Sequence, residues 1–560
     1  MKKLISALFL IMMLLTVTTS CKNEDPAANK GELTSVIYDG STKTFQLTYT
    51  SGYTNTVNAT IIDNTATATL DDGTKVMYDD ASNSGEATII TSQDIADNQY
   101  VNGWIYDEMS IYYLWNDKLS KAPDYTLDPE KFFDSILYKY HPISNPDGDR
   151  FSWIQDDYEE LQDNLSGIVS DEIGFDYILA WADQARTHYY ALVIYAKNNT
   201  DAKAKGVDRG RFITKINGQD INASNYNQLF GGTGSKTLSM ADWVYNANEE
   251  VYYLQNSGDV TINMHNRFAE NPILMDSVYT IDDKKIGYLV YNFFARDRGN
   301  NSSEYDRELM SILGSHKSQG INEMVLDLRY NSGGAVSSAI ALASALVKNR
   351  STNNVLTTSE YNSIVHNSLI REFGANYNKD YFIDKVSGTN ISIPEMNLPR
   401  LFILTSGWTA SASEFIINGL IPYMDVILIG ETTYGKNVGS ITIYEEDDEK
   451  NKWGMQPIIV RYSNSLGNSD FTAGFNPDHE VDEFDELYLY DFGNSNDPLL
   501  KKALTLITGT TRATATKSIT TPFRSSQINE KLSIEKLERN NSFEMYDDIR
   551  GDDIKRLMKK

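Results

Sequence analysis

DLRYNSGG (Asp327–Gly334), TASASE (Thr409–Glu414) and GETTYGKN (Gly430–Asn437) are the stretches from which the architecture of this chain is best inferred. Each follows a short apolar run typical of a buried strand, and such runs alternate with helical stretches over residues 266–508. This alternation predicts a largely parallel sheet with crossover helices. Open sheets of this kind place their sites at the carboxyl ends of the strands, so we expect all three stretches at one edge of the sheet.

Ser411, in the second stretch, is the candidate nucleophile. It lies between the end of a strand and the start of a helix, where we expect its hydroxyl to be accessible. The free amides and the positive end of the helix favour negative charge that develops there. The amide of Ala412 and that of Gly333 or Gly334 are suitable donors to an oxyanion, because glycine allows close approach to a carbonyl group.

Lys436, in the third stretch, is the candidate base. No G-x-S-x-G motif is present, and the six histidines fall in no recognisable catalytic motif. A lysine accepts a proton only in its neutral form, which requires a pKa lowered by burial in a poorly solvated pocket. The Gly-flanked loop after the strand VILIG is a suitable position from which Lys436 can enter such a pocket.

Together these stretches resemble the tail-specific, or C-terminal-processing, serine protease family. The family's S-A-S-E motif falls on Ser411–Glu414, its G-K on Gly435–Lys436 and its D-L-R-x-N-x-G-G on Asp327–Gly334. A G-x-x-P-D-x-x-V motif falls on Gly474–Val481, and a helical segment that ends in DRFSWI at residues 149–154 is also similar. The resemblance therefore covers residues 95–505, without the N-terminal β region and the C-terminal tail.

The resemblance implies a Ser-Lys dyad, Ser411 and Lys436, on a crotonase/ClpP-like α/β protease domain with an associated PDZ domain. Many members have glutamine four residues after the lysine, whereas this chain has Ser440, whose hydroxyl is expected to hydrogen-bond the lysine amine instead. The implied activity is that of a serine endopeptidase acting through an acyl-enzyme. Its substrates would be unfolded or C-terminally exposed proteins recognised by their tails, and it would need no metal or organic cofactor.

Other readings of the same motifs remain open. A catalytically inactive, peptide-binding protein could retain the protease fold. Gly430–Lys436 also satisfies most of a phosphate-binding G-x-x-x-x-G-K motif, but Asn437 replaces the Ser or Thr that would hold magnesium. The acidic run Glu445–Glu449 is interpreted as a solvated hairpin tip; it lacks the ligand spacing of a calcium loop.

Residues 166–265 resemble a PDZ domain. A small-residue helix from Asp201 to Lys205 precedes a strand over Phe212–Ile216 that turns at Asn-Gly. Upstream, Ile173-Gly174-Phe175 resembles the loop whose backbone amides hold the terminal carboxylate of a bound peptide. Consecutive amides can converge on an anion where glycine is present, and a strand edge can add an extended peptide, so this region is predicted to bind peptides. A simple packing module is the alternative.

The N-terminus predicts a lipoprotein. Met1–Ser20 has two lysines, an apolar run and a small-residue end, as in a secretion signal too short to span a membrane. Cys21, the one cysteine of the chain, then resembles the lipidated residue of the bacterial lipoprotein box. We therefore expect an extracytoplasmic protein held on a bacterial membrane, the outer membrane being favoured, through lipid on Cys21. A simple secretory signal with an incidental cysteine is the alternative.

Length and composition set the remaining bounds. The 560 residues carry a net charge of −27, which repels phosphate backbones, so nucleic acid is an unfavourable partner. A single cysteine excludes an intramolecular disulfide and a cysteine-based zinc site. The predicted class is a multidomain α/β protein, α+β overall. Its predicted segments are a signal peptide (1–20), a tether (21–31), a small antiparallel β domain (32–92), a helical domain (93–165), the PDZ-like domain (166–265), the protease domain (266–508), and a linker with a C-terminal helix (509–560).

Overall fold

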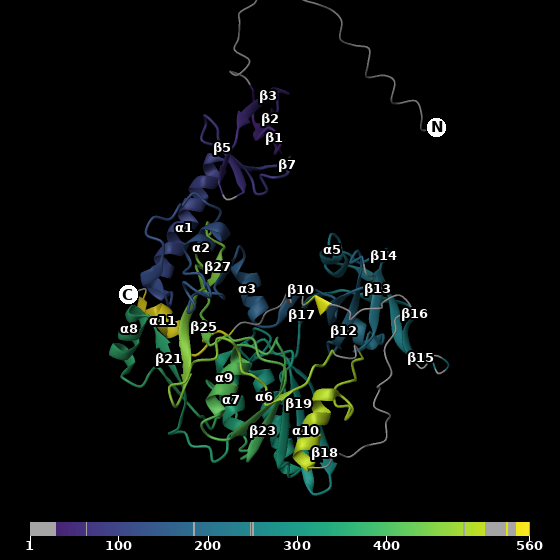
Figure 1. Cartoon of the computed structure of the whole chain (residues 1–560). Coiled ribbons are helices and arrows are strands. Elements are labelled where there is room, and N and C mark those ends of the chain that lie inside the picture. The colour runs from purple at the N-terminus through teal and green to yellow at the C-terminus, as the bar shows by residue number, and fades with distance from the viewer. Residues whose placement is uncertain are drawn as a thin grey trace, which may run out of the picture. The chain divides into compact units, whose positions relative to one another are not determined.

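The computed structural model describes residues 30–62, 64–182, 185–246, 248, 251–484, 488–509, 534–535 and 545–558 (Figure 1). The chain divides into two compact units, one of residues 1–102 and 124–129 and the other of residues 103–123 and 130–560. Within the described ranges, no helix combines the length and apolar character needed to cross a membrane. The predicted signal peptide, most of the tether and Cys21 lie outside the described residues.

The first unit contains antiparallel β structure of the kind predicted, arranged as two four-stranded sheets in the orders β3-β2-β1-β7 and β4-β5-β6-β8. Alternation along β1 buries Val36 and Tyr38 and exposes the residues between them, which is the pattern of a sheet with one face on a core. Ala59 separates β3 from β4, and its amide donates to the carbonyl of Lys43. The strands are β1 (Leu33–Asp39), β2 (Thr44–Tyr49), β3 (Thr54–Asn58), β4 (Thr60–Ile62), β5 (Thr65–Thr69), β6 (Lys75–Tyr78), β7 (Gly85–Glu86) and β8 (Thr88–Ile90).

The second unit is organised around a six-stranded sheet in the order β18-β19-β20-β23-β24-β29. The pairs from β19 to β29 are parallel and only β18 is antiparallel, which confirms the predicted, largely parallel sheet. The central strands β20 and β23 consist largely of Val, Ile, Leu, Met and Phe and are buried on both faces, as expected for parallel strands covered by helices. They are β18 (Ile273–Ile281), β19 (Lys284–Tyr291), β20 (Glu323–Asp327), β23 (Arg400–Thr405), β24 (Asp425–Gly430) and β29 (His479–Glu480).

Helices cover both faces of this sheet (Figure 1). Helix α10 (Pro498–Thr508) packs Leu500 and Ala503 against one face, with Val325 and Leu404 among the strand residues beneath it. Helices α6 (Glu304–Ser318), α7 (Val336–Leu346) and α9 (Ala412–Leu420) pack on one another in that order, and α9 contacts β24. Helix α9 ends at Leu420, because Pro422 has no amide to donate to the next helical bond.

A second sheet, in the order β22-β21-β28-β25, adjoins the helices, and a three-stranded sheet β26-β27-β9 follows it. Strand β9 (Trp153–Gln155) belongs to the DRFSWI segment and pairs with β27, so the region predicted as helical also contributes a strand to the protease region. The other elements here are β21 (Val355–Tyr361), α8 (Ser363–Phe373), β22 (Lys379–Tyr381), β25 (Val438–Ser440), β26 (Ile443–Tyr444), β27 (Gly454–Gln456) and β28 (Ile458–Asn464). The helical region comprises α1 (Ser92–Tyr112), the 3₁₀ helix η2 (Asn116–Lys118), α2 (Pro129–Ile136) and α3 (Tyr158–Leu165).

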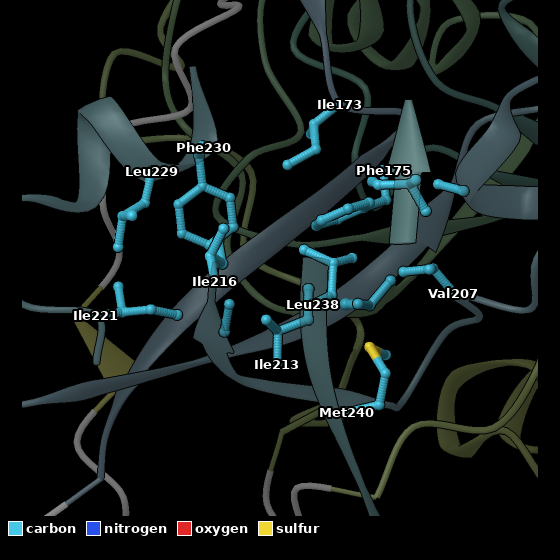
Figure 2. Packing of buried hydrophobic residues seen from close by; sticks show 14 of the residues in the cluster. Ile173, Phe175, Val207, Ile213, Ile216, Ile221, Leu229, Phe230, Leu238 and Met240 are labelled. Atoms are coloured by element: carbon cyan, nitrogen blue, oxygen red, sulfur yellow. The ribbon is translucent and has the colours of Figure 1, made fainter. Parts of the chain in front are cut away.

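The PDZ-like region forms its own sheet, in the order β16-β15-β13-β12-β11-β30. A hydrophobic cluster lies against it, and Figure 2 shows Ile173, Phe175, Ile213, Leu238 and Met240 within that cluster. The strand predicted over Phe212–Ile216 is confirmed as β13, with the same bounds. The elements are β10 (Ile168–Glu172), β11 (Phe175–Trp181), β12 (Tyr189–Ala196), α4 (Asp201–Ala204), β13 (Phe212–Ile216), β14 (Gln219–Asp220), α5 (Tyr226–Phe230), β15 (Ser235–Asn246), β16 (Val251–Asn263), β17 (His265–Ala269) and β30 (Ile534–Glu535).

The predicted linker with a C-terminal helix (509–560) lies largely outside the described residues. Its described helix is α11 (Gly551–Met558), and residues 545–550 before it are not helical. An aspartate-rich stretch favours turns and caps over helix interiors, which explains why the helix begins only at Gly551. Helix α11 packs against α8 of the second unit.

Candidate active site

The three diagnostic stretches meet at the carboxyl edge of the parallel sheet. They follow β20, β23 and β24, which are neighbours in that sheet. The amide of Ala410 donates to the carbonyl of Asn331 over 3.1 Å, which joins the first stretch to the second. The amide of Tyr434 donates to the carbonyl of Thr409 over 2.9 Å, which joins the second to the third. The predicted convergence is therefore confirmed.

Ser411 is the N-cap residue of α9 and has a strained backbone, with φ 62° and ψ −114°. A positive φ is uncommon for a residue with a side chain, and such strain is concentrated at functional sites. The residue is fully buried, whereas the sequence predicted an accessible hydroxyl. Its Oγ accepts a hydrogen bond of 2.9 Å from the amide of Met545, a residue of the C-terminal segment. The hydroxyl is thus at the expected turn but is covered by another part of the chain.

Glu414 links the nucleophile stretch to the lysine stretch. Its Oε2 accepts from the amide of Ser411 at 2.9 Å and from that of Lys436 at 2.8 Å. Its Oε1 accepts from the hydroxyl of Thr433 at 2.6 Å and from the amide of Gly435 at 2.8 Å. Burial raises the pKa of this carboxyl, and the four donors oppose the rise. One fully buried side chain therefore holds the main chains of both candidate dyad residues side by side.

Lys436 is also buried, with 4% of its surface exposed. Its Nζ lies 4.9 Å from the ring centre of Phe151, which belongs to the DRFSWI segment. Arg150 of the same segment donates to the carbonyl of Gly435 at 2.5 Å and to that of Thr472 at 3.1 Å. The DRFSWI segment thus contacts the Lys436 side chain and fixes the loop that carries it.

The glycines of the first stretch differ in their hydrogen bonds. The amide of Gly333 donates to Asn331 Oδ1 at 2.9 Å. Gly334 has φ +130°, and a Cβ at this position would lie 2.0 Å from the carbonyl oxygen of Phe294, so only glycine fits. Ala412 is the first residue of α9, where backbone amides have no partner inside the helix. Ala412 directly follows Ser411, and Met545 and Tyr546 connect the turn to the glycines, since Met545 donates to Ser411 Oγ and Tyr546 donates to the carbonyl of Gly334.

Ser440 lies on β25 and is fully buried. Its hydroxyl donates to Gln456 Oε1 at 2.6 Å, and Gln456 Nε2 donates to Thr442 Oγ1 at 2.6 Å. A glutamine is therefore present beside the position where many family members have one, but it comes from β27. The phosphate-binding reading of the lysine loop is wrong, because Lys436 leads into strand β25 and not into a helix. The acidic run Glu445–Glu449 lies in the turn between β26 and β27, which confirms the hairpin tip.

A buried charge network fixes the first stretch below the site. Arg329 is fully buried and forms ion pairs with Asp327 at 2.8 Å, Asp497 at 2.9 Å and Glu483 at 2.6 Å. Arg209, from the PDZ-like region, also pairs with Glu483. Breaking such a network by removing one partner leaves a charge without compensation, so the Asp-Leu-Arg motif has a structural role.

The predicted peptide-binding loop contains a carboxylate of its own chain. The amide of Gly174 donates to Glu172 Oε1 at 2.6 Å. Lys197, which is 3% exposed, pairs with Glu172 at 2.7 Å, with Glu270 at 3.1 Å and with Asp176 at 3.5 Å. Burial alone would lower the pKa of the Lys197 amine, but the carboxylates hold that pKa well above its ordinary value. The side chains of Ile173 and Phe175 belong to the hydrophobic cluster (Figure 2).

The fold and this site define a class: an α/β protein with a candidate serine nucleophile and a buried lysine at the carboxyl edge of its sheet. Residues 285–481 match the family model described as peptidase family S41, and residues 100–153 match the peptidase S41 N-terminal domain. Two parts of the chain therefore match models of this family, and the expected resemblance to the tail-specific or C-terminal-processing proteases is confirmed.

Individual proteins to which this chain is similar also carry protease names. A carboxyl-terminal-processing protease of Picosynechococcus sp. is 26% identical over 43% of this chain and 51% of its own length. A CtpA-like serine protease of Staphylococcus aureus strain N315 is 22% identical over 63% of both chains. The chain thus spans less than two thirds of the length of these curated relatives. A crystal structure of an S41 protease from Bacteroides fragilis NCTC 9343 is 28% identical, with a TM-score of 0.60, and the match covers 72% of this chain and 97% of that one.

Sequence reasoning missed three residues of the site, namely Glu414, Phe151 and Arg150. Glu414 was predicted only as the last residue of the S-A-S-E motif, although a glutamate three positions after an N-cap serine is a known capping signal. No local pattern could pair Phe151 and Arg150 with Lys436, because they come from a separate segment of the chain.

Proposed function

We propose that this chain is a serine endopeptidase that hydrolyses peptide bonds of protein substrates through Ser411, Lys436 and an acyl-enzyme. The observation that carries the proposal is the Glu414 carboxylate, which accepts from the amides of both residues with the same oxygen. A serine hydroxyl is a weak nucleophile unless a base is held within reach, and this carboxylate keeps the two loops together. The S41 matches support the same reaction class.

In the proposed reaction, Ser411 Oγ attacks the carbonyl carbon of the scissile bond and its proton passes to the neutral amine of Lys436. The lysine then returns this proton to the leaving nitrogen, so the C–N bond breaks and an ester to Ser411 remains. Water hydrolyses the ester with the lysine again as base, which releases the acid and restores the hydroxyl. The position of Lys436 supports this role, because its side chain is buried and its main chain is held beside that of Ser411 by Glu414.

Backbone amides at the turn supply the oxyanion hole of this proposal. Ala412, at the positive end of α9, is one donor. Gly334 is favoured as the other, since the amide of Gly333 is engaged with Asn331. Such donors act strongly because they are fixed in a site that excludes water. Ser440 remains proposed as a support of the lysine, now in combination with Gln456.

The proposed substrates are unfolded or C-terminally exposed proteins, recognised through the PDZ-like region at Ile173, Gly174 and Phe175. The sheet of that region and its small helix α4 support a PDZ-like assignment. We further propose that Cys21 carries a lipid that holds the protein on the outside of a bacterial membrane. A Cys21→Ser variant should then leave the membrane fraction, and unchanged fractionation would contradict the anchor.

The dyad is tested with the full chain, its Ser411→Ala and Lys436→Ala variants, and an unfolded protein with an apolar C-terminus. Cleavage is measured between pH 6 and about 9.5, and both variants should lose at least about 10³-fold in kcat. Undiminished cleavage by either variant would refute the dyad. Absence of cleavage by the wild type across this range would favour the inactive peptide binder.

A further inference from the structure

The C-terminal segment, residues 545–558, begins with an extended stretch beside the glycines of the candidate active site. The amide of Tyr546 donates to the carbonyl of Gly334 at 3.3 Å, and the amide of Val336 donates to the carbonyl of Tyr546 at 3.3 Å. Tyr546 accordingly forms a parallel bridge with Ala335. The segment therefore pairs with this edge as an added β-strand would.

The same stretch pairs with β25 on its other side. The amide of Ser440 donates to the carbonyl of Met545 at 3.1 Å, and the amide of Asp547 donates to the carbonyl of Ser440 at 2.9 Å. Tyr546 forms a second parallel bridge, with Ser440. A chain that pairs with both edges fills the space between them, so no other extended chain can use these edges at the same time.

The stretch also covers the candidate nucleophile. The amide of Met545 donates to Ser411 Oγ at 2.9 Å, and both residues are buried, with 1% and 0% exposure respectively. A nucleophile that acts on a polypeptide must contact the backbone of that polypeptide. In this structure the backbone in contact with the Ser411 hydroxyl belongs to the chain itself.

Buried polar contacts anchor the segment beyond its backbone pairing. Arg550 is 3% exposed and pairs with Asp380 at 2.5 Å and with Asp547 at 3.4 Å. Tyr361 donates its hydroxyl to Asp547 Oδ2 at 3.1 Å. Tyr361 lies on β21 and Asp380 on β22, so these contacts attach the segment to strands and do not depend on loop-to-loop packing.

Asp548 provides an anchor of another kind. Its Oδ1 accepts from the amide of Ser337 at 2.9 Å, and its Oδ2 accepts from the Ser337 hydroxyl. Ser337 is in the first turn of α7, whose own N-cap residue, Ala335, has no side chain that could cap the helix. The segment therefore supplies the cap of a helix that starts directly after the glycine stretch.

We propose that the C-terminal segment is an intramolecular pseudosubstrate, which occupies the path of an extended substrate past Ser411. A substrate then binds only in competition with residues 545–547, pairing with the edges at Gly334–Val336 and at Ser440. The competitor is part of the same chain, so it acts at high effective concentration. The apparent affinity for substrate is the intrinsic affinity multiplied by the fraction of molecules in which residues 545–547 have left these edges. Cleavage by this site rests on the proposed function, but the competition for the cleft does not.

The first test measures binding without turnover. A fluorescently labelled, permanently unfolded polypeptide with an apolar C-terminus is titrated into full-length Ser411→Ala protein, alone and combined with Arg550→Ala or Arg556→Ala. Arg556 is the matched control, since it is an exposed arginine of the same segment whose ion pair is with Asp553 on its own helix. Arg550→Ala should raise the affinity at least tenfold, and Arg556→Ala should leave it within twofold.

A second variant and a competition experiment guard against misfolding. Asp548→Ala removes only the α7 contact and should raise the affinity in the same direction, with the thermal unfolding transition retained. A synthetic peptide of residues 545–558 should displace the labelled polypeptide from the Arg550→Ala protein, and a peptide with the same residues in scrambled order should not. The inference would be overturned if all variants bound the labelled polypeptide with equal affinity. It would also be overturned if the scrambled peptide alone displaced the labelled polypeptide from the Arg550→Ala protein.

The same substitutions in the Ser411 background separate this inference from the proposed function. Faster cleavage by Arg550→Ala than by Arg556→Ala supports both. No cleavage by any variant, with tighter binding by Arg550→Ala, contradicts the endopeptidase but supports the pseudosubstrate. Equal cleavage and equal binding across the variants would leave the endopeptidase intact and refute the pseudosubstrate.

Discussion

The loop at Gly174 and the cleft at Ser411 are the two sites of the second unit that the sequence predicts to contact a polypeptide, and each contains a group of the chain itself. At Gly174 the group is the carboxylate of Glu172, only two residues away, fixed by the buried Lys197. At Ser411 it is the amide of Met545, which is 134 residues away along the chain. The first group cannot leave without unfolding its own loop, whereas the second can be exchanged for another extended chain.

The comparison separates a structural contact from a competitive one. A carboxylate that is adjacent in sequence and paired with a buried cation belongs to the core, so its loss is expected to affect folding. A distant segment held by backbone pairing and a few side chains can dissociate while the rest of the domain stays folded. Variants at the two sites should therefore differ in whether stability or activity changes.

The largest effect is expected for Lys197→Met. The substitution leaves the carboxylates of Glu172, Glu270 and Asp176 close together without a cation, which should destabilise the PDZ-like region by about 3–5 kcal/mol. Amide hydrogen exchange in β11 and β12 should become faster accordingly. Lys203→Met is the matched control, because its pair with Asp208 is half exposed and contributes less than about 1 kcal/mol. Similar exchange in both variants would mean that the Glu172 contact is not structural.

An effect on turnover is expected for Glu414→Gln. In the native protein both carboxylate oxygens accept from backbone N–H groups of the Ser411 and Lys436 loops. The NH₂ group of a glutamine would replace one of these oxygens and face such an N–H, so a hydrogen bond is lost and two donors repel each other. We expect kcat to fall about 100-fold, or about 2.7 kcal/mol in activation free energy, with KM nearly unchanged.

A suitable control for that variant is Glu323→Gln. Glu323 is a buried carboxylate paired with Arg400 at 2.9 Å, at the start of β20 and therefore at the edge of the sheet away from the site. The Glu323→Gln substitution should lower the midpoint of thermal unfolding and leave kcat unchanged. A fall in kcat for Glu323→Gln as large as that for Glu414→Gln would show that general destabilisation explains both.

The smallest effect is expected for Gly174→Ala. The residue has φ +94°, and a Cβ would lie 2.8 Å from Thr200 Cβ and 3.0 Å from Ala202 Cβ, so strain and crowding both oppose it. We expect a destabilisation of about 1–2 kcal/mol, measured again by exchange in β11. Gly206 also has a positive φ, +75°, but an added Cβ there would have ample space. Gly206→Ala should therefore show only the backbone-strain part of the destabilisation, about 1 kcal/mol. Equal effects would mean that the Gly174 loop has room for a ligand.

Much of the fold was predictable because its signals are local. The runs before the three stretches are apolar over the length of a strand, and strand β13 has the predicted bounds, Phe212–Ile216. Single residues also set boundaries, as Pro422 does at the end of α9 and Ala59 does between β3 and β4. The exposure of Ser411 was misjudged because it depends on what packs over the turn.

The sequence by itself determined the identity of the candidate dyad and its position at the strand ends, because a strand followed by a helix fixes the direction of the turn between them. Only the tertiary structure decided what surrounds the dyad. Phe151 reaches Lys436, Arg150 reaches Gly435 across 285 residues, and Met545 reaches Ser411. The physical reason is that periodicity along the chain encodes local structure, whereas the partner of a buried polar group is decided by how distant segments pack to satisfy it.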